Sequence, residues 1–295
     1  MTHRPAALGE LSELIVGAAA AAQPLRLIGL GTWLDGGAPV AAEAEPVSLD
    51  AFGGIIEYEP GDLTITVGAA TTIAELDAVT AAHNQWCPLA PWGGDGGSVG
   101  ATIATATPGP YAHAFGLPRD LVLGLECVDG TGKVLRPGGK VVKNVAGFDL
   151  VRLMTGSWGS LAAITRVSLR LRARPVADQT WIVSVEGDAI AAQRALRHGA
   201  TSPIACEVLP SDRTAAGSRL LVRIAGNARY VEAARTTVRQ AGHAEPSDAG
   251  AWTAIRASAP APSPRGALSD VARALNDGVK RAFDPANVLN PGIMA

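Results

Sequence analysis

Glycine is unusually frequent in this chain and gathers in its N-terminal half. There are 34 glycines among 295 residues, against an average usage of about 7% in globular proteins, and most of them precede Ser160. The segment Gly93–Gly100 alone reads GGDGGSVG. Clustered glycine indicates positive φ angles or a close approach of the backbone to another group. We therefore expect a ligand site in the N-terminal half.

The composition is that of a folded globular protein of about two domains, since 47% of the residues are hydrophobic and can supply a large core. A net charge of -2 without a basic run argues against a nucleic-acid surface. Cys87, Cys127 and Cys206 are far apart and odd in number, which argues against a disulfide framework and an iron–sulfur or zinc site. The apolar run Leu14–Ala22 is too short to span a bilayer. We expect a cytoplasmic protein, at most peripheral to the inner face of the membrane through a complex.

Residues 1–174 are predicted to form one domain that mixes helices and hairpins. Pro60-Gly61-Asp62 and Asp129-Gly130-Thr131-Gly132 are turn signals between alternating apolar runs, which predicts two hairpins. Thr71 and Thr72 are candidate N-caps with Glu75 in the first turn. The predicted elements are a helix at 8–22, strands at 25–30, 47–49, 55–58 and 63–67, a helix at 73–83, strands at 121–128 and 133–136, a helix at 149–154 and a β-rich run at 161–171.

The pattern breaks at residues 172–175, where we place a domain boundary. From there the predicted order is strand, helix, strand, strand, helix, which is the beginning of a ferredoxin-like sandwich over residues 175–265. Residues 258–264 are rich in proline and alanine and should form an exposed connector. A final helix and an Asn-Pro-Gly tail complete the chain over residues 266–295. The predicted fold class is α+β.

The turn that begins at Gly29 follows an apolar strand and reads GLGT. Successive backbone N–H groups in such a turn can form a nest for a pyrophosphate, although a plain strand-to-loop turn has the same pattern. A dinucleotide fingerprint would need a third glycine where Leu34 stands and a helix directly afterwards. Neither Lys133 nor Lys140 lies in a P-loop pattern. The sequence therefore disfavours a Rossmann NAD site and nucleoside triphosphate hydrolysis.

The glycine-dense segment continues into the small residues Ala101–Thr107. Such residues allow the backbone to contact a flat ring system, and Ser98 is placed to begin a helix whose N-terminus faces a phosphate. The alternative is a flexible surface loop, which the apolar continuation makes less favourable.

Five segments, in this order and spacing, resemble the p-cresol methylhydroxylase-type (vanillyl-alcohol oxidase-like) FAD proteins, and among them the FAD-binding subunits of bacterial glycolate oxidases. They are GLGTWLDGG, GGSVGATIATATPG, AFGLPRDLVLGLECVDGTGKVLR, KNVAGFDLVRLMTGSWGSLAAITRVSLRL and FDPANVLNPG. The resemblance covers residues 25–171 well and the last ten residues sharply. It implies a two-subdomain FAD-binding domain of this type, followed by the ferredoxin-like α+β domain, with a tail that returns to the flavin.

The resemblance also implies which residues hold FAD. Gly29, Gly31 and Thr32 would hold the pyrophosphate, and Ile164 would offer a backbone contact. The remaining positions implied are Gly97, Ser98, Gly100 and Ala101 along the pyrophosphate and ribityl chain, and Gly116, Arg119 and Asp120 near the adenosine. From the expected close approach of the backbone, Gly100→Val should abolish FAD retention and leave a folded domain.

The candidate catalytic residues are Lys143, Asn144 and Asn290. An ammonium group beside a flavin stabilises the reduced anionic ring or a substrate carboxylate. The less favoured alternative is that Lys143 sits on a solvated strand end. Asn290 resembles the tail residue that returns to the flavin in related dehydrogenases, and an ordinary C-terminal turn is the alternative. Tyr111 and His113 either line the open face of the flavin or are a loop aromatic and a surface histidine.

Two features set this chain apart from its larger relatives. No histidine or cysteine stands in GLGTWLDGG, so FAD should be bound non-covalently. The five histidines include no pair at metal-ligand spacing, so no metal site is expected and independent substrate oxidation is in doubt.

We expect an FAD-dependent oxidoreductase, namely the FAD-binding subunit of a 2-hydroxy-acid (glycolate-type) oxidase or dehydrogenase that passes electrons from its small-molecule substrate through the flavin to a partner. The expected partners are a larger catalytic flavoprotein subunit and an iron–sulfur subunit, without nucleic acid. The alternatives are a non-catalytic assembly or electron-relay subunit of such a complex, and a stand-alone FAD oxidase of another small alcohol.

Overall fold

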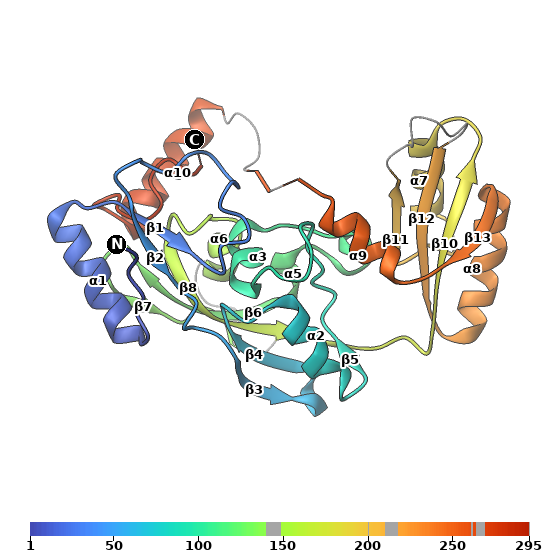
Figure 1. The fold of residues 1–295 in the computed structure, drawn as a ribbon, viewed down its shortest axis with the longest axis horizontal. Helices are drawn as coiled ribbons and strands as arrows, with labels where there is room; N and C mark the ends of the chain where they lie inside the picture. Colours follow the sequence, from blue (N-terminus) through green and yellow to red (C-terminus); the bar gives the residue numbers. More distant parts are fainter. Residues whose placement is uncertain (140–148, 200, 210–217, 261, 264–268, 295) are drawn as a thin grey trace.

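The computed structural model describes residues 1–139, 149–199, 201–209, 218–260, 262–263 and 269–294. Two parts lie side by side along the long axis of the molecule (Figure 1). The larger contains the N-terminal helices and strands together with the C-terminal helix, and the smaller contains β10–β13 with α7 and α8. The α+β fold class is confirmed. The boundaries at residues 174 and 265 stay a prediction.

The larger part is built on a five-stranded antiparallel sheet in the order β3-β4-β8-β6-β7. Both predicted hairpins are present. The strands are β3 Ile55–Glu59, β4 Thr64–Gly68, β6 Val122–Asp129, β7 Val134–Leu135 and β8 Ala162–Arg170, with a 3-10 turn, η1 Pro60–Asp62, between the first two. The main core lies between this sheet and the helices α2 Ile73–Ala81, α3 Val99–Thr105 and α6 Leu150–Met154.

Helix α2 begins where the sequence predicts. Thr72 is its N-cap and accepts a hydrogen bond from the Glu75 N–H, while the Glu75 carboxylate accepts one from the Thr72 N–H. The Thr72 N–H and the Thr72 hydroxyl both donate to the Glu75 carboxylate, and these hydrogen bonds lower the pKa of Glu75. The reciprocal pair satisfies N–H groups that a helix start otherwise leaves unpaired.

A second layer joins the two ends of the chain. Strand β1 (Leu25–Ile28) pairs in parallel with β2 (Glu45–Ser48), and Leu289 of the C-terminal tail forms a parallel bridge to Leu25. Helix α1 (Leu8–Ala21) packs Leu11 and Ile15 into the same core as Val288 and Leu289. The tail therefore returns to the strand that leads into the Gly29 turn.

The smaller part has the order β10-α7-β11-β12-α8-β13 and the antiparallel sheet order β11-β12-β10-β13. Numbered within this unit, the strands lie in the order 2-3-1-4, which is the ferredoxin-like arrangement. Helices α7 and α8 pack on one face of the sheet around a core of their own. The elements are β10 Ala177–Val185, α7 Ala189–Arg197, β11 Ala205–Val208, β12 Ser218–Gly226, α8 Ala228–Ala241 and β13 His243–Ser247.

The other face of this sheet packs against the larger part. Leu221 and Ala205 of the sheet meet Trp86 and Tyr111 of the larger part and Trp252 of helix α9 (Gly250–Ala257) in one buried cluster. Helix α9 was not predicted from the sequence, and it lies between the two parts in Figure 1. Short elements near the boundary are β5 Gln85–Trp86, which pairs with β9 Arg172–Ala173, and the helices α4 Ala112–Phe115 and α5 Pro118–Leu121.

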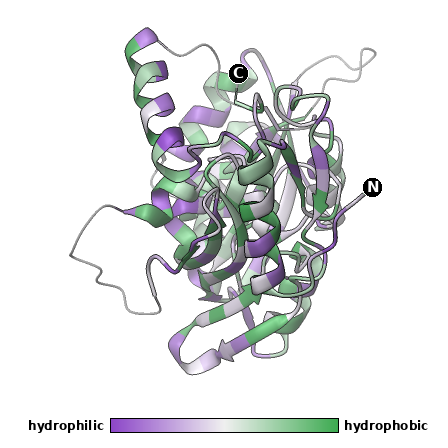
Figure 2. Ribbon diagram, turned by 90° about the vertical axis from the view of Figure 1, so that its left-hand side faces the viewer, coloured by the Kyte–Doolittle hydropathy of each residue, from purple (hydrophilic) through white to green (hydrophobic). Residues whose placement is uncertain are grey.

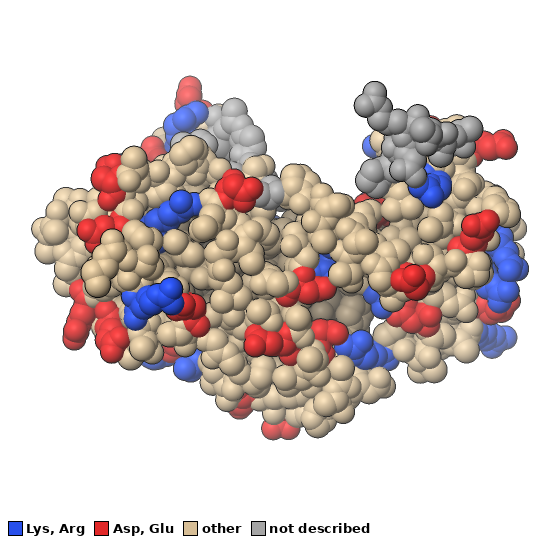
Figure 3. Space-filling view, in the orientation of Figure 1, with Lys and Arg blue, Asp and Glu red and all other residues tan. Residues whose placement is uncertain are grey.

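Helix α10 (Asp270–Phe283) completes the fold close to the predicted position and leads into the buried tail. Hydrophobic residues concentrate on the inner elements, and hydrophilic residues spread over the outer helices and turns (Figure 2). On the face seen in Figure 3, acidic and basic side chains are interspersed. That face carries no large field of one sign of the kind that attracts nucleic acid.

Candidate functional site

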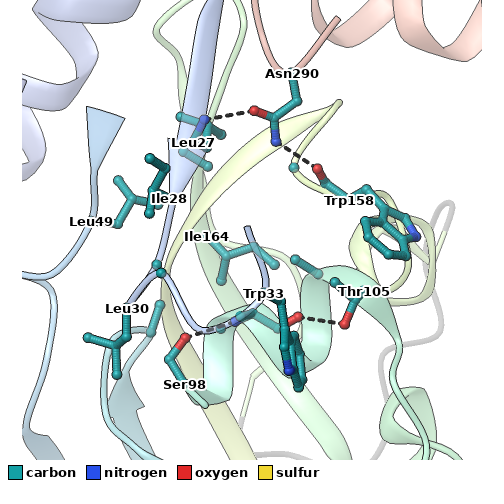
Figure 4. A pocket seen from close by; sticks show the side chains of 18 of the residues that line it. Leu27, Ile28, Leu30, Trp33, Leu49, Ser98, Thr105, Trp158, Ile164 and Asn290 are labelled. Atoms are coloured by element: carbon teal, nitrogen blue, oxygen red, sulfur yellow. Dashed lines mark hydrogen bonds between the residues drawn. The ribbon is translucent and has the colours of Figure 1, made fainter. Parts of the chain in front are cut away.

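A cleft opens at the end of β1, between the Gly29 turn, helix α3 and the start of β8 (Figure 4). It holds about 890 Å³ of empty space, including its open mouth. Seven of the predicted cofactor-binding residues and one predicted catalytic residue line it: Gly29, Gly31, Thr32, Ser98, Gly100, Ala101, Ile164 and Asn290. The structure thus brings together residues from four distant segments of the sequence.

The Gly29 turn supplies the free hydrogen-bond donors of the cleft. Gly31 has a φ of 75°, which a glycine adopts without steric cost. Among the described residues, none accepts a hydrogen bond from the N–H of Leu30, Gly31 or Thr32. Unpaired N–H groups in a glycine turn suit an anion such as a pyrophosphate. This is the observation by which the cleft fits the phosphates of a dinucleotide.

Helix α3 forms one wall of the cleft, but its N-terminal donors are already used. The N–H of Val99 donates to the Thr71 oxygen at 2.9 Å, that of Gly100 to the Ala69 oxygen at 2.7 Å, and that of Ala101 to Ser98 Oγ at 3.2 Å. The expectation that this helix start faces a phosphate is therefore wrong. Instead, Ala101, Ala104 and Thr105 offer a wall of small side chains.

Gly100 is required by packing inside the protein. A Cβ at this position would lie 2.6 Å from Ala69 Cβ and 2.9 Å from the Ala69 oxygen, so a larger side chain must displace α3 from the end of β4. The expectation that Gly100→Val spares the fold is therefore wrong, because the glycine has an internal partner as well as a place in the cleft.

The flat ring against the glycine-dense segment is that of Trp33. A Cβ on Gly93 would lie 2.5 Å from Trp33 Nε1, and one on Gly97 would lie 3.6 Å from the Trp33 ring. Trp33 also lines the cleft next to Thr32, and Figure 4 places its ring beside Ser98. Gly97 therefore does not line the cleft itself. It contacts Trp33, which does. Sequence reasoning missed Trp33, although a tryptophan within a glycine turn was a visible signal.

Asn290 lies in the opposite wall of the cleft, and both ends of its side-chain amide form hydrogen bonds. Its Oδ1 accepts a hydrogen bond from the Leu27 N–H at 2.7 Å, and its Nδ2 donates to the Trp158 oxygen at 2.8 Å. The residue is 3% exposed and has a φ of 43°. The tail reaches the cleft, and the Asn290 amide holds β1 to the turn before β8. Its return to a flavin stays a prediction.

A second cavity adjoins the cleft, and the two share Thr105 and Trp158. Arg119 and Arg152 are the only charged side chains among its described lining residues. Arg152 also pairs with Asp149, three residues earlier, at 3.2 Å. Val208 of β11 and Ile255 of α9 line the far side of this cavity, so it lies where the two parts of the molecule meet.

The other predicted residues lie elsewhere. Gly116 and Asp120 pack against each other, and Asp120 accepts a hydrogen bond from the Leu117 N–H. Neither Gly116 nor Asp120 lines either cavity. Lys143 and Asn144 lie outside the described residues.

Tyr111 and His113 do not line the cleft or the second cavity. The Tyr111 hydroxyl bonds to Arg223 and the His113 ring to the Pro203 oxygen at 2.7 Å. Burial raises the pKa of Tyr111 and lowers that of His113. Both residues therefore hold the boundary between the two parts of the molecule.

Metal clusters and membrane-spanning helices are both absent from the part of the chain that the structure describes. No group of three His, Cys, Asp or Glu residues is placed to hold a metal ion. No helix there is long and apolar enough to cross a bilayer.

Residues 2–138 match a protein family described as an FAD binding domain. This part of the chain, which contains the Gly29 turn and helix α3, is therefore similar to an FAD binding domain, and the match supports FAD as the cofactor. The resemblance drawn from the motifs is confirmed.

Two relatives indicate the wider group. The chain is 40% identical over 123 residues to the glycolate oxidase subunit GlcE of Escherichia coli (strain K12), which is 41% of this chain and 35% of that protein. It is 33% identical over 168 residues to the D-lactate dehydrogenase of Archaeoglobus fulgidus, which is 57% of this chain and 38% of that enzyme. The matches thus span little more than a third of the length of each of these two relatives.

The fold extends beyond these matches. An alkyldihydroxyacetonephosphate synthase structure superposes on 87% of this chain and 55% of its own, with a TM-score of 0.68 and 18% identity. At this identity the likeness concerns the fold alone. The superposition includes most of the chain, so the similarity of fold extends beyond the N-terminal domain.

Proposed function

We propose that this chain is the FAD-binding subunit of a 2-hydroxy-acid (glycolate-type) oxidoreductase that passes electrons from substrate through a non-covalent flavin to a partner. The observation that carries the proposal is the cleft at the Gly29 turn, whose N–H donors at Leu30, Gly31 and Thr32 have no acceptor among the described residues. The sequence similarity to a glycolate oxidase subunit and a D-lactate dehydrogenase supports the substrate class.

Because the two cavities share Thr105 and Trp158, we place FAD across both of them, with its phosphates at the Gly29 turn. The first cleft is lined by the Gly29 turn, helix α3, β8 and the tail. The second cavity is lined in part by Val208 and Ile255 of the C-terminal half. A substrate can approach the reactive ring most readily where two parts of a molecule meet. The adenosine end therefore belongs in the first cleft and the flavin ring in the second.

This placement gives Arg119 and Arg152 a role on the flavin side, whereas the motif resemblance put Arg119 near the adenosine. Their guanidinium groups are the only charges among the described residues that line the second cavity. Arginine suits planar recognition of a carboxylate. The pair would orient a 2-hydroxy carboxylate and stabilise the negative charge that a flavin gains when it accepts a hydride.

The electron acceptor and the assembly are part of the same proposal. We expect a larger catalytic flavoprotein subunit and an iron–sulfur subunit, with the complex in the cytoplasm and at most peripheral to the membrane. The name of the Escherichia coli relative, a glycolate oxidase subunit, supports an assembly of more than one chain.

A non-catalytic electron-relay or assembly subunit is the second candidate, and Asn290 favours it. Both ends of its amide are engaged by backbone groups of Leu27 and Trp158. Asn290 is the one predicted catalytic residue that the structure describes, and its amide is therefore already engaged in hydrogen bonds within the fold.

The test is a visible spectrum of the purified chain, before and after FAD is added, followed by anaerobic glycolate or D-lactate. A saturable flavin spectrum that bleaches with substrate supports a competent oxidoreductase. Flavin that binds but stays oxidised supports the second candidate, and bleaching restored by a co-purified partner supports the subunit role. An absence of flavin binding would contradict both.

A further inference from the structure

Helix α9 of the C-terminal half is fastened to the glycine-dense segment of the FAD domain through Arg256. This side chain is 7% exposed. Its Nε donates to the Pro91 oxygen at 3.1 Å and its Nη2 to Asp95 Oδ1 at 2.5 Å. The backbone oxygen of the same residue accepts from the Gly93 N–H at 2.9 Å. Three hydrogen bonds from one residue thus fix the segment from Pro91 to Asp95.

The indole of Trp33 packs on the surface of this fixed segment. Gly93 and Gly97 have no side chain where the Trp33 indole packs, and a Cβ on Gly93 would lie 2.5 Å from Trp33 Nε1. Trp33 follows directly on Thr32, the last of the three free donors. A shift of the segment therefore moves the indole and, through it, the turn that faces the phosphates.

The same helix is anchored on its other side to the ferredoxin-like sheet. Trp252 is 2% exposed, and its Nε1 donates to Thr180 Oγ1 of β10 at 3.1 Å. Helix α9 therefore connects the sheet of the C-terminal half to the wall of the FAD cleft.

We propose that Arg256 is a positioning residue for FAD. It holds the segment Pro91–Asp95 against Trp33, so that docking of the C-terminal half shapes the phosphate end of the cleft. The inference rests on the proposed placement of FAD phosphates at the Gly29 turn, and it goes beyond that proposal by making FAD affinity depend on a residue of the C-terminal half.

The experiment measures the dissociation constant of FAD for the full-length chain, by quenching of flavin fluorescence, in Arg256→Met and Asp95→Ala. Asp95→Ala removes the same Arg256–Asp95 hydrogen bond by changing the more exposed partner, since the Asp95 side chain is 34% exposed. Because either variant removes the charge-assisted hydrogen bond that fixes this segment, we expect a dissociation constant raised about tenfold or more in each.

Arg223→Met is the matched control. Arg223 also crosses the boundary between the two parts, since it bonds to Tyr111, and it pairs with Asp178 of its own sheet. Neither partner lines the first cleft or the second cavity. We expect this variant to lose thermal stability without a change in FAD affinity. In a Trp33→Ala background, Arg256→Met should add little to the loss already present, because two residues that act through one contact are not additive.

The proposal is overturned if Arg256→Met and Asp95→Ala bind FAD within twofold of the wild type, or if Arg223→Met weakens binding as much as they do. It is equally overturned if the losses from Trp33→Ala and Arg256→Met add in full. Failure of the proposed function differs, because there the wild-type chain itself would bind no FAD or would not bleach with a 2-hydroxy acid.

Discussion

The side-chain amide of Asn290 donates a hydrogen bond of 2.8 Å to the backbone oxygen of Trp158, 132 residues earlier in the chain. The same amide accepts from the Leu27 N–H. The C-terminal tail, β1 and the turn before β8 are therefore held at one point, and that point is a wall of the cleft at the Gly29 turn. The end of the chain is needed to complete a site whose other parts come from the first 170 residues.

Asn290→Gly removes the amide without adding backbone strain, because glycine tolerates the positive φ at this position. It leaves the Leu27 N–H and the Trp158 oxygen without partners, so we expect a loss of about 2–4 kcal/mol in the free energy of unfolding. Urea denaturation gives the value. Asn287→Gly is the control, because Asn287 also has a positive φ, 53°, but is exposed. An equal loss in the two variants would show that the amide bridge contributes nothing.

The contact between Gly130 and the buried Asp284 provides a second test. A Cβ on Gly130 would lie 2.4 Å from Asp284 Oδ1, and Asp284 is fully buried and accepts from the N–H groups of Val288 and Leu289. Gly130→Ala should therefore cost about 1–3 kcal/mol through overpacking. Gly278→Ala within α10 has nothing within 4 Å and should stabilise by about 0.5–1 kcal/mol. Thermal melts that move in the same direction for both would refute this reading of the contact.

Local patterns predicted the hairpins and the start of α2, because a Pro-Gly-Asp turn and a Thr-x-x-Glu capping box carry their geometry within a few residues. The cleft residues at Gly29–Thr32 and Ser98–Ala101 were also identified, through motifs that resemble a known family. Trp33 and Arg256 were missed because their partners lie about 60 and 160 residues away in the sequence, at Gly93 and Asp95. Nothing local tells which ring covers a glycine or which carboxylate meets an arginine.

The three cysteines predict how the protein responds to alkali. Burial raises the pKa of Cys87, Cys127 and Cys206 from 9.0 to about 12. Below pH 9 the thiols stay protonated in both states. Above it the unfolded chain loses these protons while the folded chain keeps them, so stability falls from pH 9 to about 12, by about 1.4 kcal/mol per pH unit for each thiol.

Urea denaturation at pH 8.5, 9.5 and 10.5 checks this slope against Cys206→Ala, which should lose about one third of it if the thiols dominate. Because the thiolate is the reactive form, iodoacetamide at pH 8 should label the three cysteines only after unfolding. Rapid labelling of the folded protein would contradict the burial of the thiols.

Gly31→Ala tests the turn that we place at the phosphates. An alanine held at a φ of 75° costs about 1–2 kcal/mol, and relief of that strain would turn the N–H groups of Leu30 and Thr32 away from a common anion. We expect FAD to bind about tenfold more weakly by fluorescence titration. Gly54→Ala carries the same strain at a φ of 90°, with open space around it and away from the cleft. It should lower the urea midpoint by a similar amount and leave FAD affinity unchanged. If FAD binds Gly31→Ala as tightly as it binds Gly54→Ala, the phosphates lie elsewhere, and the free donors of the turn serve another ligand.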